Sequence, residues 1–537
     1  MKALGRGLMV ALAIAALLAG CRGRQSPYAG GAGGAQQVIR VAQATVPTTL
    51  DPAQVEDGPT IELMMQVFEG LVQWSPDNEL VPALATDWTI SADGRTYTFA
   101  IRRGVKFHNG RELTADDFVF SINRCLNPRL NSPVSRTYMG DLVGATDVIE
   151  RRATTCAGVE APDPYTLKLT IDPPKAYFLA KLTYPTWYAV CQDVIDGPDG
   201  VIADASGFVG TGPFKLEEYR TQESIRLAAN AAYWDGAPEL TGMERRIILE
   251  PSTRHAMFET GGLDIVDVSM ADYRADQADP DLAPLLQSFE RPSVYYLALN
   301  QGGFAPFRDR RVRQAFAHAI NKQEALDTVF LGLPRRAEGI IPPGVPGHEP
   351  EFAGLAYDPA KARQLLAAAG YPNGRNFPPL DIRVRAASPD LRRTCEVVVE
   401  DLKQNLNIDV PIRELEWGVF LQQRNQGVMP FYFLRWAADY LDPQNFLSLM
   451  LHSQAQENTL GYHNAEFDRL CDQADVLQDH QERLRLYQRA QRLAVDDAVW
   501  VPLYYQKDIE LWSPRLRGVD DSAMGHLPHK HTYFAPE

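Results

Sequence analysis

The chain has 537 residues and a formal net charge of -15, with 45% hydrophobic and 23% charged residues. This length suits two or three domains of ordinary size, and the composition is that of a soluble protein. The acidic balance argues against nucleic acid as a partner, because phosphate backbones are bound by basic surfaces.

The N-terminus predicts an exported, lipid-anchored protein. A short positive stretch precedes an apolar run from Leu8 to Leu18, which is shorter than the roughly 20 residues of a membrane-spanning helix. The run ends in Leu18-Ala19-Gly20-Cys21, which resembles a bacterial lipobox. We therefore expect residues 1–21 to be a lipoprotein signal with lipidation at Cys21, and the glycine-rich residues 22–37 to be a flexible tether. The alternative is an ordinary secretory signal in which the cysteine occurs by chance.

Three segments in the N-terminal half have clear local signals. Tyr97, Phe99 and Ile101 alternate with smaller residues, which predicts a strand before Gly104. The sequence from Thr114 to Asp117 resembles a capping box and predicts a helix that continues to about residue 126. Residues 210–213 are glycine-rich but end in proline, so they predict a turn into a strand and not a phosphate-binding loop.

The C-terminal half alternates between helical and strand patterns. A helix should begin at Asp358-Pro359 and end at Gly370. Beyond it, strand patterns at 380–384, 408–412 and 431–434 are separated by helical patterns at 389–405 and 417–425. This order predicts a βαβ unit and a largely parallel sheet, so the fold class is α/β or α+β.

Six cysteines are present, and their spacing does not specify a metal site. If Cys21 carries lipid, five remain, so at least one thiol is unpaired. Export permits disulfides, but spacing alone cannot give their pairing. The remaining five are Cys125, Cys156, Cys191, Cys395 and Cys471.

Catalytic signatures are absent from the sequence. There is no GxSxG elbow, HExxH pair, phosphate loop or GxGxxG turn. His526, His529 and His531 cluster near the C-terminus, but without a cysteine or carboxylate at ligand spacing they favour a polar terminal segment over a metal site. We therefore expect no enzymatic activity, no cofactor and no metal, with an exported hydrolase as the distant alternative.

Several longer motifs resemble those of the family 5 extracellular solute-binding proteins, which include oligopeptide- and dipeptide-binding components of ABC importers. The resemblance covers nearly the whole mature chain. Its most specific part is the run of motifs at Val81–Trp88, Arg103–Gly110 and Leu113–Ser121, supported by Gly210–Phe214, Gly262–Ile265 and Tyr462–Asn464.

The resemblance implies a periplasmic-binding-protein-like α/β fold of type II, with two lobes, a hinge and an extra domain inserted in the first lobe. The first lobe is expected at residues 38–74, 206–292 and 506–537, with the inserted domain at 75–205. The second lobe is expected at 293–505. The chain should cross between the lobes near 293–300 and 503–506, because hinge closure needs only a few residues to absorb the rotation.

The resemblance also implies the ligand-binding residues. The segment from Trp436 to Pro443 matches a motif in which an aspartate accepts the α-ammonium of a peptide, so Asp439 should be that acceptor and Trp436 a wall of the pocket. The alternative is that Asp439 caps a local turn. Trp417 should line the pocket or pack in the core, and Tyr295 should face the cleft or pack within its strand.

Arg435 departs from the family pattern, in which a small residue often precedes the tryptophan. Its side chain should point away, contact a ligand carboxylate or reshape the pocket. The expected function is therefore capture of a small ligand, a peptide, for ABC permease and ATPase subunits, by a monomer in the periplasm or at the cell surface. The alternatives are an oligosaccharide, nickel or another solute as ligand, and a sensor in place of a transport receptor.

Overall fold

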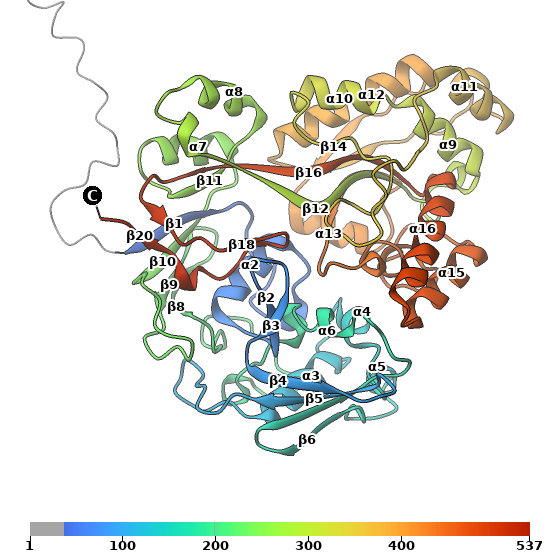
Figure 1. Cartoon of the computed structure of the whole chain (residues 1–537). Helices are drawn as coiled ribbons and strands as arrows, with labels where there is room; N and C mark the ends of the chain where they lie inside the picture. The colour runs from blue at the N-terminus through green and yellow to red at the C-terminus, as the bar shows by residue number, and fades with distance from the viewer. Residues whose placement is uncertain (1–36, 198, 537) are drawn as a thin grey trace, which may run out of the picture.

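The computed structural model describes residues 37–197 and 199–536. The signal, the lipidation at Cys21 and most of the tether predicted above therefore lie outside the described residues. A ten-stranded sheet runs across the top of the molecule and down its left side in Figure 1, in the order β14-β13-β15-β12-β16-β11-β1-β10-β9-β8.

The first lobe forms one end of this sheet. In the first lobe β1 lies parallel to β10 and to β11, while β10, β9 and β8 are antiparallel to one another. The glycine-rich turn at 210–213 leads directly into β8, as predicted. The elements are β1 (Val38–Gln43), α2 (Gly58–Val67), β8 (Phe214–Arg220), β9 (Ser224–Ala229), β10 (Gly242–Ile247), α7 (Pro251–Glu259), β11 (Ile265–Asp267) and α8 (Met270–Ala278).

An inserted domain below the first lobe contains an antiparallel sheet of order β4-β5-β7-β6. Its helix α3 starts as predicted, since the Asp117 carboxylate accepts a 2.9 Å hydrogen bond from the backbone N–H of Thr114. The elements are β2 (Val72–Trp74), β3 (Leu80–Pro82), β4 (Ala85–Ile90), β5 (Thr96–Ile101), α3 (Ala115–Leu126), α4 (Ser135–Met139), α5 (Ala145–Ile149), β6 (Val159–Asp163), β7 (Thr166–Thr170) and α6 (Phe178–Lys181).

The second lobe contains the predicted βαβ unit. Its helices α11 and α12 occupy the predicted segments, and Gly370 follows α11 with φ 97°. The elements are α9 (Arg310–Ala319), α10 (Lys322–Val329), α11 (Pro359–Ala368), β13 (Ile382–Arg385), α12 (Pro389–Leu406), β14 (Ile412–Leu415), α13 (Trp417–Asn425), β15 (Phe431–Ala437), α14 (Ser448–Leu451), α15 (Ala465–Val476) and α16 (His480–Asp496).

Two details of the predicted βαβ unit are wrong. The strand predicted at 408–412 begins only at Ile412, because α12 ends at left-handed Asn407 and the buried residues Ile408 and Val410 pack into the core before the ladder starts. The parallel pairs of the sheet are β13 with β14 and β15 in the second lobe and β1 with β10 and β11 in the first. It is mixed overall, since the strands that link the lobes are antiparallel to their neighbours.

Two long strands, β12 (Leu286–Leu299) and β16 (Trp500–Trp512), join the lobes. Residues 286–290 of β12 pair with the end of β16 that also pairs with β11, whereas residues 294–298 pair with both β16 and β15. The register of β12 against β16 shifts between Glu290 and Val294. This irregularity marks the place where the sheet passes from one lobe to the other, and the predicted fold of two lobes and an inserted domain is confirmed.

A C-terminal segment returns to the first lobe and contacts the hinge strands through Asp521 and His526. It contains β17 (Leu516–Arg517), β18 (Asp521–Ser522), β19 (Gly525–His526) and β20 (Tyr533–Phe534). The five cysteines of the described region are buried free thiols, so this region contains no disulfide.

Candidate functional site

A cavity of about 500 Å³ lies where the two lobes and the inserted domain meet. Its volume falls within the range of small-ligand sites in proteins, roughly 300–1,000 Å³. The wall combines the start of α2, the hinge strands, β15, the start of α13 and the inserted domain. All five predicted ligand-contact residues line it: Tyr295, Trp417, Arg435, Trp436 and Asp439.

Asp439 is a largely enclosed carboxylate just beyond the end of β15. It accepts hydrogen bonds from the Tyr138 hydroxyl, at 2.6 Å, and from the Asn445 side-chain amide, at 3.1 Å. Burial raises its pKa to about 6. The local turn is capped by Asp442, which accepts from the backbone N–H of Gln444 at 2.9 Å, so turn capping does not explain Asp439.

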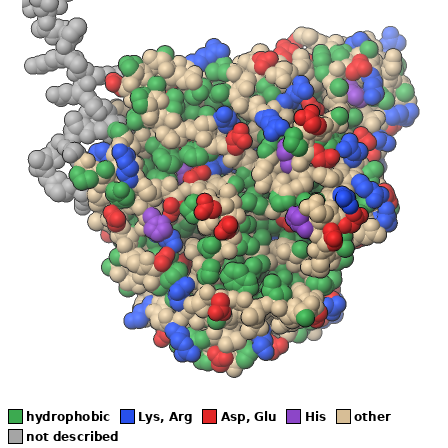
Figure 2. All heavy atoms as spheres, viewed as in Figure 1, with side chains coloured by type: hydrophobic (Ala, Val, Ile, Leu, Met, Phe, Trp, Pro, Cys, Tyr) green, Lys and Arg blue, Asp and Glu red, His purple; other side chains and the backbone are tan. Residues whose placement is uncertain are grey.

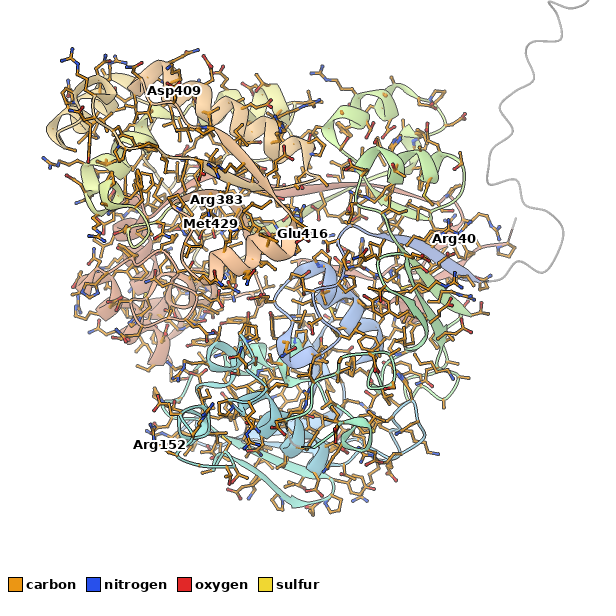
Figure 3. The ribbon with its side chains drawn as sticks, turned by 180° about the vertical axis from the view of Figure 1, so that it is seen from behind. Arg40, Arg152, Arg383, Asp409, Glu416 and Met429 are labelled. Atoms are coloured by element: carbon orange, nitrogen blue, oxygen red, sulfur yellow. The ribbon has the colours of Figure 1, made fainter. Side chains whose placement is uncertain are left out.

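The two tryptophans form aromatic walls of the cavity. The Trp436 indole N–H donates to the backbone oxygen of Asn445 at 3.0 Å, which fixes the ring beside Asp439. Trp417 stands at the first position of α13 and stacks on Phe420, with ring centroids 5.8 Å apart. Figure 3 shows this end of α13, marked by Glu416, facing the first lobe. Trp417 thus packs on the core with one side and meets the cavity with the other.

The two tyrosines of the hinge strand point to opposite faces of the sheet, as neighbours in a strand do. Tyr296 is buried and stacks on Trp500, with centroids 3.7 Å apart. Tyr295 is half-buried, stacks on Tyr504 at 4.6 Å and lines the cavity.

Arg435 points toward the cavity from β15. It lies opposite Tyr295 in the β12–β15 ladder, and one guanidinium nitrogen donates to the Gln506 side-chain oxygen at 2.7 Å. The Gln506 amide in turn donates to Asp508 at 2.5 Å. Arg435 is therefore held by the hinge strand β16 and does not point away.

Residues of the inserted domain complete the site, and the sequence did not identify them. Tyr138 in α4 stacks on Tyr184, with centroids 3.7 Å apart, and both rings line the cavity. Tyr138 lies 301 residues from its partner Asp439, and a lone tyrosine in a short helix carries no local signal of this contact.

The C-terminal histidines do not converge on a metal. His526 contacts Glu510 at 2.9 Å and Asp521 at 3.1 Å. Burial alone would lower the pKa of His526, but these two carboxylates outweigh burial and raise the pKa to about 10. Burial lowers the pKa of His529 to about 3, and His531 contacts Asp520 at 2.6 Å. Each histidine has its own environment, and no cluster of three or more potential metal ligands occurs among the described residues.

Beside His526, Arg291 ties the C-terminal segment to the hinge. Its guanidinium donates to Asp508 of β16 at 2.8 Å and to Asp521 at 2.7 and 2.9 Å. Arg291 sits within the register shift of β12, so this network fixes the strand where the lobes meet.

No helix within residues 37–197 and 199–536 combines the length and hydropathy needed to cross a membrane. Acidic and basic side chains are interspersed over the face shown in Figure 2, and hydrophobic side chains gather near α4 and α6, where the inserted domain approaches the second lobe.

Comparison with known proteins agrees with this architecture. The chain is 32% identical over 504 residues to heme-binding protein A of Haemophilus influenzae, covering 90% of each chain. It is 27% identical over 540 residues to the dipeptide-binding protein DppE of Bacillus subtilis, covering 98% of each.

The structure also resembles the murein tripeptide-binding protein MppA of Escherichia coli. The TM-score is 0.86 at 26% identity, with 94% of this chain and 99% of the other covered. Against the unliganded open form of MppA the TM-score is 0.67. The profile of the bacterial extracellular solute-binding proteins, family 5, matches residues 79–458, and the chain therefore belongs to this family.

Proposed function

We propose that the chain captures peptides in the cavity between its lobes and delivers them to the permease and ATPase subunits of an ABC importer. The observation that carries this proposal is Asp439, an enclosed carboxylate with two neutral hydrogen-bond donors and no cation within salt-bridge distance among the described residues. A peptide α-ammonium would supply the missing positive charge, and a charge-assisted hydrogen bond in an enclosed site is strong.

The aromatic walls suit the rest of such a ligand. Trp436 and Trp417 offer flat apolar surfaces that accept side chains of different kinds without demanding one shape. Several relatives are named as peptide-binding proteins, including DppE. The family and the cavity together support a binding protein that leaves its ligand intact.

We further propose that the protein acts as a lipid-anchored monomer in the periplasm or at the cell surface, attached through Cys21. The lobes would rotate about residues 291–294 of β12 and 505–507 of β16, where the ladder between the strands is irregular. Mass spectrometry of the mature protein tests the anchor, because Cys21→Ser should abolish an acylated N-terminal peptide.

The ligand is tested by thermal unfolding in the presence of candidate ligands. Peptides with a free N-terminus, at 100 times their dissociation constant, should stabilise the protein by about 2.7 kcal/mol. N-acetylated peptides should not, and the peptides should be recovered uncleaved. Asp439→Asn should abolish the response. If only heme, nickel or a disaccharide raises the unfolding midpoint, the peptide proposal is wrong.

A further inference from the structure

The two lobes touch at the rim of the cavity through a polar contact that the proposed function does not use. Glu56 precedes α2 in the first lobe, and its carboxylate accepts a 2.8 Å hydrogen bond from the side-chain amide of Asn425, the last residue of α13 in the second lobe. Figure 3 shows α13 beside the N-terminal segment to which Glu56 belongs. Glu56 is half-buried and lines the cavity, whereas Asn425 is exposed. The contact therefore joins the lobes where the cavity meets solvent.

On the second-lobe side, Asn425 is oriented by its neighbours. The Arg424 guanidinium donates to the side-chain oxygen of Asn425 at 3.0 Å and forms a 2.6 Å ion pair with Glu457. Both partners of this ion pair are largely buried. Because Arg424 occupies the side-chain oxygen of Asn425, the amide nitrogen is the end that faces Glu56. The second lobe thus presents a fixed, neutral donor to the carboxylate of the first lobe.

The surroundings of Glu56 disfavour its negative charge. Burial raises the pKa of Glu56, and the charges of Glu457, facing it from the second lobe, and of Asp57, its chain neighbour, raise the pKa further. The hydrogen bond from Asn425 and the charge of Arg424 offset this only in part. Asp57 caps α2 and Glu457 is paired with Arg424, so both carboxylates have structural roles of their own. The neutral form of Glu56 is therefore favoured where the lobes meet.

Opening of the lobes changes the environment of Glu56. When the lobes separate, Glu56 loses Asn425 and the second-lobe charges, and its carboxylate meets water. A carboxyl group with a higher pKa in the closed form stabilises that form at low pH, and this contribution is lost as the pH rises through the raised pKa. A protonated carboxyl still has an oxygen that can accept from the Asn425 amide. The contact therefore survives protonation, whereas the penalty for burying the charge does not.

We propose that Glu56 and Asn425 form an acid-strengthened clasp between the lobes, which shifts the protein toward its closed form as the pH falls below neutral. The clasp joins two protein groups, so this inference does not depend on which solute the cavity takes. Asp439 also meets a residue across the lobes, Tyr138, and its raised pKa acts in the same direction. Variants of the clasp residues are therefore needed to separate the clasp from Asp439.

Small-angle X-ray scattering of the ligand-free protein at pH 8 and pH 5, fitted as a mixture of open and closed forms, tests the clasp. In the wild type the ratio of closed to open molecules should rise from pH 8 to pH 5. Glu56→Gln is neutral at both pH values and keeps an accepting oxygen. Its ratio at pH 8 should therefore exceed that of the wild type by about three-fold, and its dependence on pH should be weaker.

Asn425→Asp replaces the donor of the clasp by a second carboxylate. At pH 8 the ratio of closed to open molecules should fall below that of the wild type, and it should recover at pH 5, where the two carboxyl groups can share a proton. Combining Glu56→Gln with Asn425→Asp exchanges donor and acceptor and should restore the wild-type ratio at pH 8, which also shows that the variants are folded. Glu223→Gln is the matched control. It removes an exposed carboxylate from the turn between β8 and β9 of the same lobe, so it should match the wild type at both pH values.

The outcomes that overturn the clasp are distinct from those that overturn the proposed function. If Glu56→Gln and Asn425→Asp both match the wild type at pH 8, the contact does not act on closure. If Glu56→Gln opens the protein at pH 8, the ionised carboxylate favours closure and the proposed acid dependence is wrong. If the wild type is already closed at pH 8, Asn425→Asp decides, and its failure to open overturns the clasp. The proposed function is tested separately by the response of thermal unfolding to peptides.

Discussion

Asp439 is held in the unliganded protein at a cost to stability. Burial raises its pKa from 3.8 to about 6, so the unfolded chain ionises this group at lower pH than the folded one. Stability is therefore lost as the pH rises from about 4 to 6, by up to about 3 kcal/mol at pH 7. This loss of stability with rising pH is expected for a carboxylate that serves ligand binding and does not stabilise the fold.

Asp439→Asn should accordingly stabilise the unliganded protein. The new side-chain oxygen can still accept from Tyr138 and Asn445, which both donate to the same oxygen of the carboxylate. We expect the free energy of unfolding to increase by about 1–3 kcal/mol at pH 7.5 and by roughly half as much at pH 5. Urea denaturation at the two pH values measures this difference. If Asp439→Asn lowered the free energy of unfolding equally at the two pH values, ionised Asp439 would not destabilise the folded protein.

The affinity for peptide should depend on pH through the same group. A bound ammonium lowers the pKa of Asp439, so the peptide binds the form of the protein in which Asp439 is ionised. Where Asp439 is protonated before binding, the peptide displaces that proton. The peptide ammonium itself stays protonated below about pH 7. The association constant should rise with pH between 5 and 7, approaching ten-fold per unit below pH 6. Calorimetry at pH 5.5 in two buffers of different ionisation enthalpy should detect proton release, and its absence would place the ammonium elsewhere.

Two residues that the sequence predicted from a continuous motif lie in the cavity wall. Trp436 and Asp439 stand three residues apart in a recognisable segment, and the structure brings both to the cavity. Tyr138 and Arg385 were missed, because their contribution depends on how distant elements pack and neither has a local signature. The orientation of Arg435 was left open for the same reason, since Gln506 lies 71 residues away.

At the scale of elements, predictions were correct where capping and proline signals were strong. Helices α3, α11 and α12 begin at the predicted residues because an aspartate or a proline fixes their first turn. The strand before α13 was misplaced because Ile408 and Val410 alternate as a strand would, yet they fill the core after a left-handed residue. Alternating hydrophobic residues therefore predict which side chains are buried. They do not predict where the hydrogen bonds of a strand begin, because those bonds depend on the neighbouring strand.

The hinge strand β12 provides a prediction at the same scale. Arg291→Lys leaves one ammonium where a guanidinium bridges Asp508 and Asp521, so the free energy of unfolding should fall by about 1–3 kcal/mol. The C-terminal segment 518–531 should then take up deuterium faster in hydrogen exchange. Arg152→Lys is the control, because Arg152 forms an exposed ion pair in the inserted domain, at the far end of the molecule from Asp409 of the second lobe (Figure 3). This substitution should change neither the free energy of unfolding nor the rate of exchange. Unchanged exchange in Arg291→Lys would show that Arg291 does not fasten the segment.

At the scale of the whole molecule, the inserted domain and the second lobe are in direct contact. Besides Tyr138 and Asp439, the Tyr177 and Tyr440 rings stack with centroids 6.1 Å apart, and Lys175 lies 3.9 Å from Asp475. The TM-score against the open form of MppA, 0.67, is lower than the 0.86 against the other MppA structure, so the lobes of this protein are arranged differently from those of the open form. These contacts must break when the cavity opens, so they bias the balance between open and closed forms.

Lys175→Met tests whether this contact outside the cavity favours closure. Lys175 is mostly buried beside Asp475, which also accepts from Ser448 and Tyr487, and removing the ammonium withdraws an attraction that exists only when the lobes meet. The unliganded variant should have a larger radius of gyration in small-angle X-ray scattering. Its apparent affinity for trialanine should fall about 5- to 20-fold, because a smaller fraction of molecules is closed.

The preference for trialanine over N-acetylated trialanine should stay the same in Lys175→Met, since the residues that contact the ligand are unchanged. Lys106→Met is the matched control, because Lys106 is an exposed lysine of the same inserted domain and forms no ion pair among the described residues. It should match the wild type in both scattering and affinity. If Lys175→Met also matches the wild type, the interdomain contact does not contribute to closure.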